Sequence, residues 1–242
     1  MEPNELPDRT HSGHATRVGR RGEPRLPAAI AVIVAAALYA LLPERLLLGP
    51  RLLIPALEAA LLVAVLIVRP RHLTAETRLS RAISMTLAVV IALANITALG
   101  MLVATTVNNQ DAPGGSLLLG GLQVWATNVI AFALIFWELD RGGPVARTQL
   151  DRDDLQLADF RFSHDEDHDA VTEVAKGSSA KADWIPTFID YLYVSTTNSS
   201  AFSPTDTMPL SSRAKALMGI EATAALLTSL IVIARAVGAL GG

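Results

Sequence analysis

The chain has 242 residues, of which 51% are hydrophobic and 5% aromatic, and its formal net charge is −3. The apolar residues occur in long blocks, which is untypical of a soluble domain and indicates an integral membrane protein. The sequence contains no cysteine, which excludes disulfides, thiol catalysis and cysteine-ligated metals. We expect no nucleic-acid partner.

The chain begins with a polar, basic stretch. Residues 1–25 have no long apolar run, so we expect a disordered basic tail that is retained and not cleaved as a signal peptide. Residues 26–137 then contain four apolar blocks, each near the roughly 20 residues that a membrane-spanning helix needs. The four transmembrane helices are expected at Leu26–Leu42, Leu52–Val68, Ala82–Val107 and Leu117–Trp137. The position of Trp137 at the end of its block is typical of the membrane interface.

The charges of the short connectors predict the orientation of the helices. The connector Arg69–Arg81 is the most basic, whereas Asn108–Ser116 carries no Lys or Arg. Because basic connectors stay on the cytoplasmic side, the N-terminus is expected in the cytoplasm and the protein in the plasma membrane of a bacterium.

The fourth helix is followed by an acidic soluble segment, residues 138–183. Its charge is concentrated in Ser163–Asp169, where His164 and His168 stand four residues apart among carboxylates. This spacing would place both imidazoles on one face of a helix, where they could hold a divalent metal ion. The alternative is an acidic run that is only solvated.

Residues 184–242 contain a pore-like loop and the last transmembrane helix, Ala214–Leu240. Within Trp184–Leu210, many hydroxyl and amide side chains follow an apolar start, and these would be costly against lipid. We therefore expect a re-entrant half-helix at Ile185–Thr196 and then an irregular turn. The polar residues of this turn, which would line an ion path, are Thr196, Thr197, Asn198, Ser199 and Ser200, with Asp206 on the way out.

The order of these features resembles the pore region of potassium channels. The end of the pore helix would match Tyr191–Thr197, the filter Asn198–Thr205 and the exit Asp206–Pro209. The resemblance implies a path for monovalent cations, formed by a homo-oligomer around the loop. The filter is degenerate, because no glycine occurs from Lys181 to Met218 and filter glycines let the carbonyls point inward. The loop would also enter from the cytoplasm, opposite to potassium channels.

A longer stretch, from about Trp125 to Leu240, is similar to an uncharacterised family of small bacterial multi-span membrane proteins. The resemblance rests on FWELDRGGP (Phe136–Pro144), on the aromatic segment before the Ser-Pro-Thr-Asp turn, and on the basic start of the last helix. The activity of this family is not established, so the resemblance implies no mechanism.

Two carboxylates lie within apolar helices, Glu58 in the second and Glu221 in the last. Charges at such depth usually face the bundle interior, a partner or a water path. Either residue could couple to protons or cations, or could tie helices together as a neutral hydrogen-bonded carboxyl. Glu221 is placed to approach Asn198 and the hydroxyls of the turn. Asn95 and Asn128 are expected to bond helices to each other.

These features predict an all-α integral membrane protein with five transmembrane helices and one re-entrant half-helix and loop before the last helix. The expected function is channel-like or transport-related. The alternative is a non-conducting membrane scaffold or sensor whose acidic segment binds a partner. The sequence shows no nucleophile–base constellation, so we expect no enzyme activity and no cofactor. The expected partners are the lipid bilayer, monovalent cations and further copies of the chain.

Overall fold

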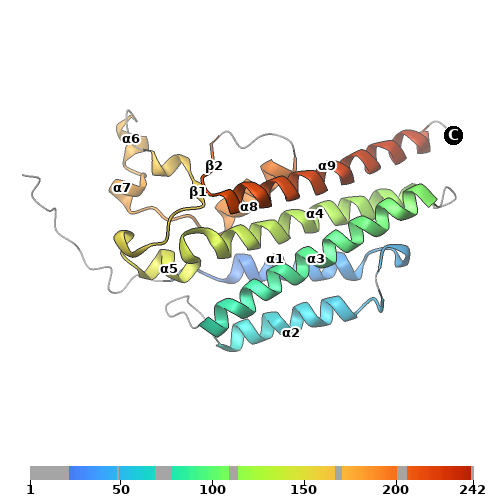
Figure 1. Ribbon diagram of the computed structural model, residues 1–242, viewed down its shortest axis with the longest axis horizontal. Coiled ribbons are helices and arrows are strands. Elements are labelled where there is room, and N and C mark those ends of the chain that lie inside the picture. The colour runs from blue at the N-terminus through green and yellow to red at the C-terminus, as the bar shows by residue number, and fades with distance from the viewer. Residues whose placement is uncertain are drawn as a thin grey trace, which may run out of the picture.

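The computed structural model describes residues 22–47, 49–68, 78–108, 114–166, 171–200 and 206–240. Five helices run side by side along most of its length (Figure 1). They are α1 (Leu26–Ala40), α2 (Leu53–Val68), α3 (Arg78–Asn108), α4 (Gly114–Leu139) and α9 (Ser212–Leu240). Helix α4 is the central one, because it contacts α1, α3 and α9 as well as the short helix α8.

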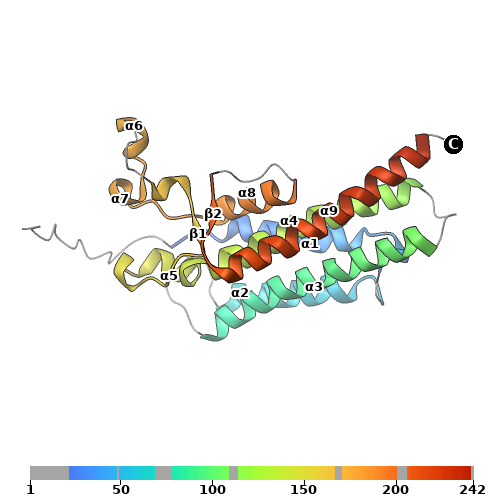
Figure 2. The ribbon, with the colours of Figure 1, turned by 45° about the horizontal axis from the view of Figure 1, so that its top comes forward.

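The shorter elements gather mostly at one end of this bundle (Figure 2). They are η1 (Glu44–Leu46), η2 (Asp140–Gly142), α5 (Pro144–Gln149), η3 (Arg152–Asp154), β1 (Phe160–Arg161), η4 (Ser163–Asp165), α6 (Thr172–Ala175), α7 (Ser179–Ala182), α8 (Phe188–Ser199) and β2 (Met208–Pro209). Strands β1 and β2 pair antiparallel, with Phe160 opposite Pro209. We call the described part of residues 140–183 the cap.

Three helices are long and apolar enough to cross a membrane. These segments are Leu79–Asn108, Gly114–Gly142 and Ser212–Val237. Helices α1 and α2 are more apolar than these three but have only 15 and 16 residues. At 1.5 Å per residue each spans about 24 Å or less, short of the ~30 Å hydrocarbon layer. The prediction of a mainly helical protein with membrane-spanning helices is confirmed at this level.

The core is richest in aromatic side chains at the capped end of the bundle. Phe136 of α4 packs its ring 5.1 Å from that of Phe160 in β1, and Trp137 meets Phe188 of α8 edge-on at 5.9 Å. Trp137 is buried, and its indole N–H donates to both carboxylate oxygens of Glu23 at 3.0 Å. Trp137 therefore packs inside the protein, and its position at the membrane interface stays a prediction.

The predicted disordered tail falls mostly outside the described residues, which begin at 22. Its last part is described and packs against the bundle. Glu23 and Arg25 are both buried, and Arg25 donates to the backbone oxygen of Val65 at 3.0 Å. The tail prediction is wrong for this part, because two charged side chains find polar partners inside the protein.

Helices α8 and α9 begin at the same end of the bundle, the end that carries the cap (Figures 1 and 2). Helix α8 has 12 residues, about 18 Å, so it covers only part of the bundle's length. After the residues 201–205, which lie outside the description, β2 is again beside β1 at the capped end. Both ends of the segment between the cap and α9 thus lie at the capped end, and the re-entrant course of this segment stays a prediction.

The irregular turn expected at Thr196–Ser200 is wrong for most of its residues. Helix α8 continues to Ser199, and Ser200 is its C-terminal cap. The Thr196 and Thr197 hydroxyls donate to the carbonyls of Leu192 and Tyr193 within the same helix, at 2.7 and 3.0 Å. These bonds satisfy the polar side chains locally, so a run rich in hydroxyls stays helical.

Candidate functional site

A buried carboxyl stands between α8 and α9. Glu221 of α9 is fully buried, and three side chains of α8 converge on it. Asn198 donates to its Oε2 at 2.7 Å, Ser199 donates to its Oε1 at 3.0 Å, and the Ser195 hydroxyl also contacts Oε1. We call these four residues the Glu221 cluster.

The Glu221 cluster continues across the bundle as a polar layer. Asn128 of α4 donates to the backbone oxygen of Glu221 at 3.2 Å, and Asn95 of α3 donates to the Asn128 side-chain oxygen at 3.3 Å. Both asparagines are buried. Four helices are thus bonded to one another through side chains at one level, and the expectation that Asn95 and Asn128 bond helices together agrees with these contacts.

The residues of α8 that face Glu221 are spaced so that they lie on one side of the helix. Ser195, Asn198 and Ser199 are separated by three and four residues, so they share one face. The contact expected between Glu221 and Asn198 is present. Ser195 was not singled out from the sequence, although its spacing to Ser199 identifies it once α8 is known to be helical.

The other predicted path residues do not meet at Glu221. Thr196 and Thr197 bond back into α8, as described above. Ser200 caps that helix, and Asp206 is exposed two residues before β2. Of the predicted path residues in the loop, only Asn198 and Ser199 therefore meet Glu221.

Glu58 is a second buried carboxyl, in α2. It is 1% exposed, and among the described residues its Oε2 has no hydrogen-bond partner. Helix α2 packs on α1 and α3 and not on α8 or α9 to any comparable extent. Glu58 thus belongs to a different part of the bundle from the Glu221 cluster.

A fully buried arginine joins the cap to the bundle. The Arg147 guanidinium donates to the backbone oxygens of Trp137 and Asp140 at 2.8 and 2.7 Å. It lies 4.9 Å from the centre of the Tyr191 ring, in a cation–π arrangement, and 3.8 Å from the Glu23 carboxylate. Arg147 thereby links the end of α4, the start of α8 and the residues before α1.

Asp140 is the acidic counterpart of this arginine. Its Oδ2 accepts from the Tyr191 hydroxyl at 2.5 Å, and its Oδ1 accepts from the backbone N–H of Asp159 at 2.7 Å. Arg141, next to it, has a left-handed backbone and donates to Asp165 at 2.6 Å. The motif from Glu138 to Pro144 therefore ends α4 with a sharp turn that anchors the cap.

Glu23 shows the electrostatics of this region. Burial raises the pKa of the Glu23 carboxyl above its ordinary value. The Arg147 guanidinium, the backbone N–H of Phe188 at 2.7 Å and the Trp137 indole oppose that rise, because they stabilise the ionised form. Burial outweighs these contacts, so the folded chain holds the proton of Glu23 more tightly than the unfolded chain does.

The cap is also fixed to the start of α9. Asp159 is buried and accepts two hydrogen bonds from the Arg213 guanidinium, at 2.7 and 2.6 Å. The Ser211 hydroxyl contacts the same carboxylate. The backbone N–H of Leu210 donates to the backbone oxygen of Asp159 at 2.8 Å. The segment before α9 is held by this aspartate together with the pairing of β2 to β1.

The predicted metal site is not formed by the residues that the structure describes. His164 lies in the short helix η4, with its ring stacked on Trp184 at 4.3 Å, while His168 falls outside the description. Within the described ranges no three His, Cys, Asp or Glu residues stand close enough to hold a metal ion. His164 is occupied in packing, which the charge pattern of the sequence did not indicate.

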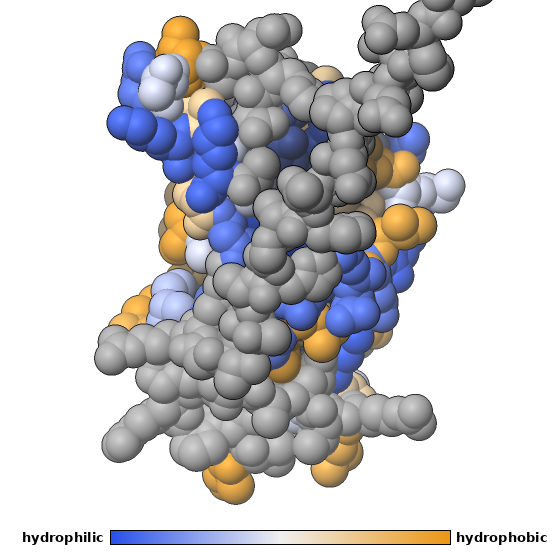
Figure 3. Space-filling model, turned by 90° about the vertical axis from the view of Figure 1, so that its left-hand side faces the viewer, coloured by the Kyte–Doolittle hydropathy of each residue, from blue (hydrophilic) through white to orange (hydrophobic). Residues whose placement is uncertain are grey.

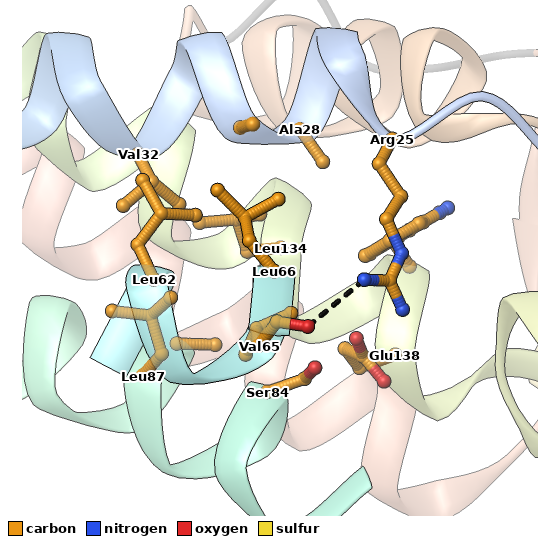
Figure 4. A pocket seen from close by; sticks show the side chains of 13 residues that line it. Arg25, Ala28, Val32, Leu62, Val65, Leu66, Ser84, Leu87, Leu134 and Glu138 are labelled. Atoms are coloured by element: carbon orange, nitrogen blue, oxygen red, sulfur yellow. Dashed lines mark hydrogen bonds between the residues drawn. The ribbon is translucent and has the colours of Figure 1, made fainter. Parts of the chain in front are cut away.

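A small cavity opens between α1, α2, α3 and α4 at the capped end. Figure 4 shows its mostly apolar wall, with Arg25, Ser84 and Glu138 as polar members. Its volume of about 50 Å³ suits a few water molecules and is too small for an organic substrate. The cavity lies beside α1 to α4 and does not include the Glu221 cluster.

The fold and site together define a helical, candidate membrane protein with a buried carboxyl bonded between a half-length helix and a long one. Comparison with protein-family models, curated proteins and solved structures gives no match. The function of the chain is therefore inferred from its own geometry.

Proposed function

We propose that the chain is a channel-like or transport-related protein of the bacterial plasma membrane, with an ion path that passes between α8 and Glu221. The observation that carries the proposal is the convergence of three polar side chains of a half-length helix on one buried carboxyl. Carboxyls at such depth usually mark an ion or proton site.

The proposed topology has five spans, with α1 and α2 as the two short ones. The capped end holds the N-terminal side of α1, the ends of α2 and α4, and the starts of α8 and α9 (Figure 1). Helix α2 ends and α3 begins at this end, and the sequence between them, Arg69–Arg81, is basic. By the positive-inside rule this end is cytoplasmic, so α8 enters from the cytoplasm.

The described conformation is a closed one in this proposal. Glu221 is fully buried and Ser199 is 5% exposed, so an ion reaches the carboxyl only after α8 moves. Helix α8 touches α9 less extensively than it touches α4, and its C-terminal end leads into residues 201–205. A potassium-type filter is ruled out by the lack of glycine from Lys181 to Met218, and the polar face of α8 lines the proposed path in its place.

The test is ion flux in liposomes that contain the purified protein. Proton, sodium and potassium gradients are imposed in turn, and flux above that of empty liposomes is expected for at least one ion. Glu221→Gln removes the ionisable group while keeping its shape, so it should reduce this flux. Flux equal to that of empty liposomes for all three ions would rule the proposal out.

A second candidate is a membrane scaffold or sensor whose acidic segment binds a partner. The observation in its favour is the exposed apolar Leu157, 92% exposed in the cap and preceded by the exposed Asp151 and Asp154. Figure 3 shows the capped end, where hydrophilic residues predominate among the described atoms. An exposed leucine near acidic side chains suits a partner whose surface is apolar and basic.

The scaffold candidate is tested at Leu157. Deleting Ser163–Asp169 is a poor test, because Asp165 holds Arg141 and Ser179 and the deletion would disrupt the cap. Leu157→Ser changes only an exposed side chain. A partner that co-purifies with the wild type and is lost in Leu157→Ser supports the scaffold function, and unchanged co-purification contradicts it.

A further inference from the structure

The Ser195 hydroxyl contacts two oxygen atoms, and each of these contacts requires a proton between the two oxygens that it joins. One is the backbone oxygen of Val129 in α4, at 2.8 Å, and the other is Oε1 of Glu221. A hydroxyl has a single proton to donate. If Glu221 were ionised, one of the two contacts would place two acceptor oxygens against each other without a proton.

A protonated Glu221 satisfies every atom of this group. The carboxyl then donates its proton to the Ser195 oxygen, and Ser195 donates its own proton to the Val129 carbonyl. Asn198 and Ser199 still donate to the carboxyl oxygens, each of which has capacity for these bonds. The result is a directed chain of hydrogen bonds from α9 through α8 to α4.

The surroundings of Glu221 offer no charge to balance a carboxylate. Within the described residues no basic side chain pairs with it, and the side chains that contact it are serines and an asparagine. An ionised carboxylate that is fully buried without a cation is costly. Helices α3, α4 and α8 and strand β2 pack against α9, and β2 carries no titratable side chain.

The titratable groups on the packed helices lie further toward the capped end. On α8 these are Asp190, which bonds Thr187, Tyr191, which bonds Asp140, and the half-exposed Tyr193. On α4 the nearest is Glu138, ten residues or about 15 Å from Asn128 along the helix. On α3 it is Arg81, fourteen residues or about 21 Å from Asn95. None of them is a partner of Glu221.

We infer that the ion bound at the Glu221 cluster is a proton, and that its release breaks the hydrogen bond by which Ser195 of α8 holds α4. This inference rests on the proposed function and names its ion. When α8 moves and water reaches Glu221, the O–H bond of Glu221 breaks, the proton passes to the water and the carboxylate keeps the electron pair. The Ser195 proton then turns to the carboxylate, so the bond from Ser195 to Val129 is lost and α8 stays in the open position while Glu221 is ionised.

The first test reads the protonation state of the full-length protein directly by infrared spectroscopy. The spectrum of Glu221→Gln is subtracted from that of the wild type at neutral pH. The difference should contain the carbonyl band of a protonated carboxyl, which disappears when the pH is raised. A difference that contains only the bands of an ionised carboxylate would overturn the inference. Glu58→Gln serves as the matched control, because it removes the other buried carboxyl.

The second test identifies the ion in liposomes that contain the wild type, Glu221→Gln or Ser195→Ala. Proton flux that is lost in Glu221→Gln, without sodium or potassium flux, supports the inference. Sodium or potassium flux that depends on Glu221, with no proton flux, leaves the proposed function standing and overturns the inference. No flux of any ion overturns both.

The Ser195 variant separates the proton relay from a merely structural bond. Ser195→Ala removes the bridge between Glu221 and Val129, whereas Ser195→Thr keeps the hydroxyl. The pH at which the infrared band of Glu221 disappears should shift in Ser195→Ala and return toward the wild-type value in Ser195→Thr. An unchanged titration in both variants would contradict the relay.

Discussion

At the residue scale, Ser195 has more consequence for the structure than its small size suggests. Its hydroxyl bonds two helices at once, and its removal leaves the Val129 carbonyl and a Glu221 oxygen without that partner. We expect Ser195→Ala to lower the free energy of unfolding by about 1–3 kcal/mol. Thermal unfolding in detergent measures the change.

The matched control for Ser195→Ala is Thr223→Ala in α9. The Thr223 side chain is exposed and donates only to the carbonyl of Gly219 in its own helix, at 2.8 Å. Its loss should leave the unfolding temperature nearly unchanged, since surface changes usually stay within about 0.5 kcal/mol. Equal effects of the two variants would show that the Ser195 bridge is not formed.

Glu23 gives the stability of the protein a dependence on pH. Its pKa is raised above the ordinary 4.5, so the folded chain keeps the proton to a higher pH than the unfolded chain does. The stability that Glu23 contributes is therefore fully present below 4.5 and is lost as the pH rises through the raised value.

The measurement is the thermal midpoint of the wild type and of Glu23→Gln across this pH range. The wild-type midpoint minus that of the variant should fall as the pH increases. A difference that is constant, or that grows with pH, would mean that the favourable contacts with Arg147, Trp137 and Phe188 outweigh burial.

The residues of the sites could be predicted from the sequence only in part. Glu221 and Glu58 stand out because a carboxylate in an apolar block is rare, and Asn198 and Ser199 stand out through their polarity. Arg147, Asp140 and Glu23 could not be predicted, because a polar residue outside a block gives no sign that it is buried. The bond from Phe188 to Glu23 joins residues 165 apart in the chain.

At the element scale, the close contact of α4 with α9 depends on Gly121. A Cβ atom at this position would stand 2.4 Å from a methyl carbon of Val232. Gly121→Ala should therefore force the helices apart and cost about 1–3 kcal/mol. The thermal midpoint in detergent is the measurement.

Gly100 in α3 provides the opposite case within the same bundle. A Cβ atom there would meet nothing within 4 Å. Gly100→Ala should stabilise the protein by about 0.5–1 kcal/mol, because alanine favours the helix over glycine. If both glycines respond alike, the described contact between α4 and α9 is wrong.

The joint between cap and bundle should be sensitive to Arg147. Arg147→Met leaves Glu23 buried beside α8 without its cation, and we expect a cost of about 3–5 kcal/mol. Adding Glu23→Gln in the same chain should restore part of that loss, because the uncompensated charge is gone. Additive losses from the two changes would argue against a direct interaction.

The helices could be predicted well from the sequence, and the course of the loop less well. Apolar blocks mark α1 to α4 and α9 to within a few residues, since burial in lipid or protein requires them. The extent of α8 was missed at its C-terminal end, where Thr196 and Thr197 keep the helix by bonding to its carbonyls. The Thr187–Asp190 capping box at its start is visible in the sequence.

At the scale of the whole molecule, the capped end of the bundle should face the cytoplasm and the opposite end the outside. The chain has no cysteine, so single cysteines can be labelled with a thiol reagent that does not cross membranes. Asp154→Cys and Asp206→Cys should react only from the cytoplasmic side. Glu44→Cys, at the other end of the bundle, should react only from outside, since its side chain is 88% exposed.

Each deviation in this labelling has a definite meaning. Reaction of all three cysteines from one side would contradict the spanning bundle. Reaction of Asp154→Cys from outside would reverse the orientation, and reaction of Asp154→Cys and Asp206→Cys from opposite sides would contradict the re-entrant course of α8. The order of the helices decides which helix ends lie together at one end of the bundle. The positive-inside rule assigns the capped end to the cytoplasm.

The most direct test of the central claim is ion flux through Ser199→Leu in liposomes. Ser199 is buried on the face of α8 that meets Glu221, so a leucine there should block the path and abolish the wild-type flux. Thr223→Leu places the same side chain on the exposed face of α9 and should conduct like the wild type. Equal flux through wild type, Ser199→Leu and Thr223→Leu would contradict a path between α8 and Glu221.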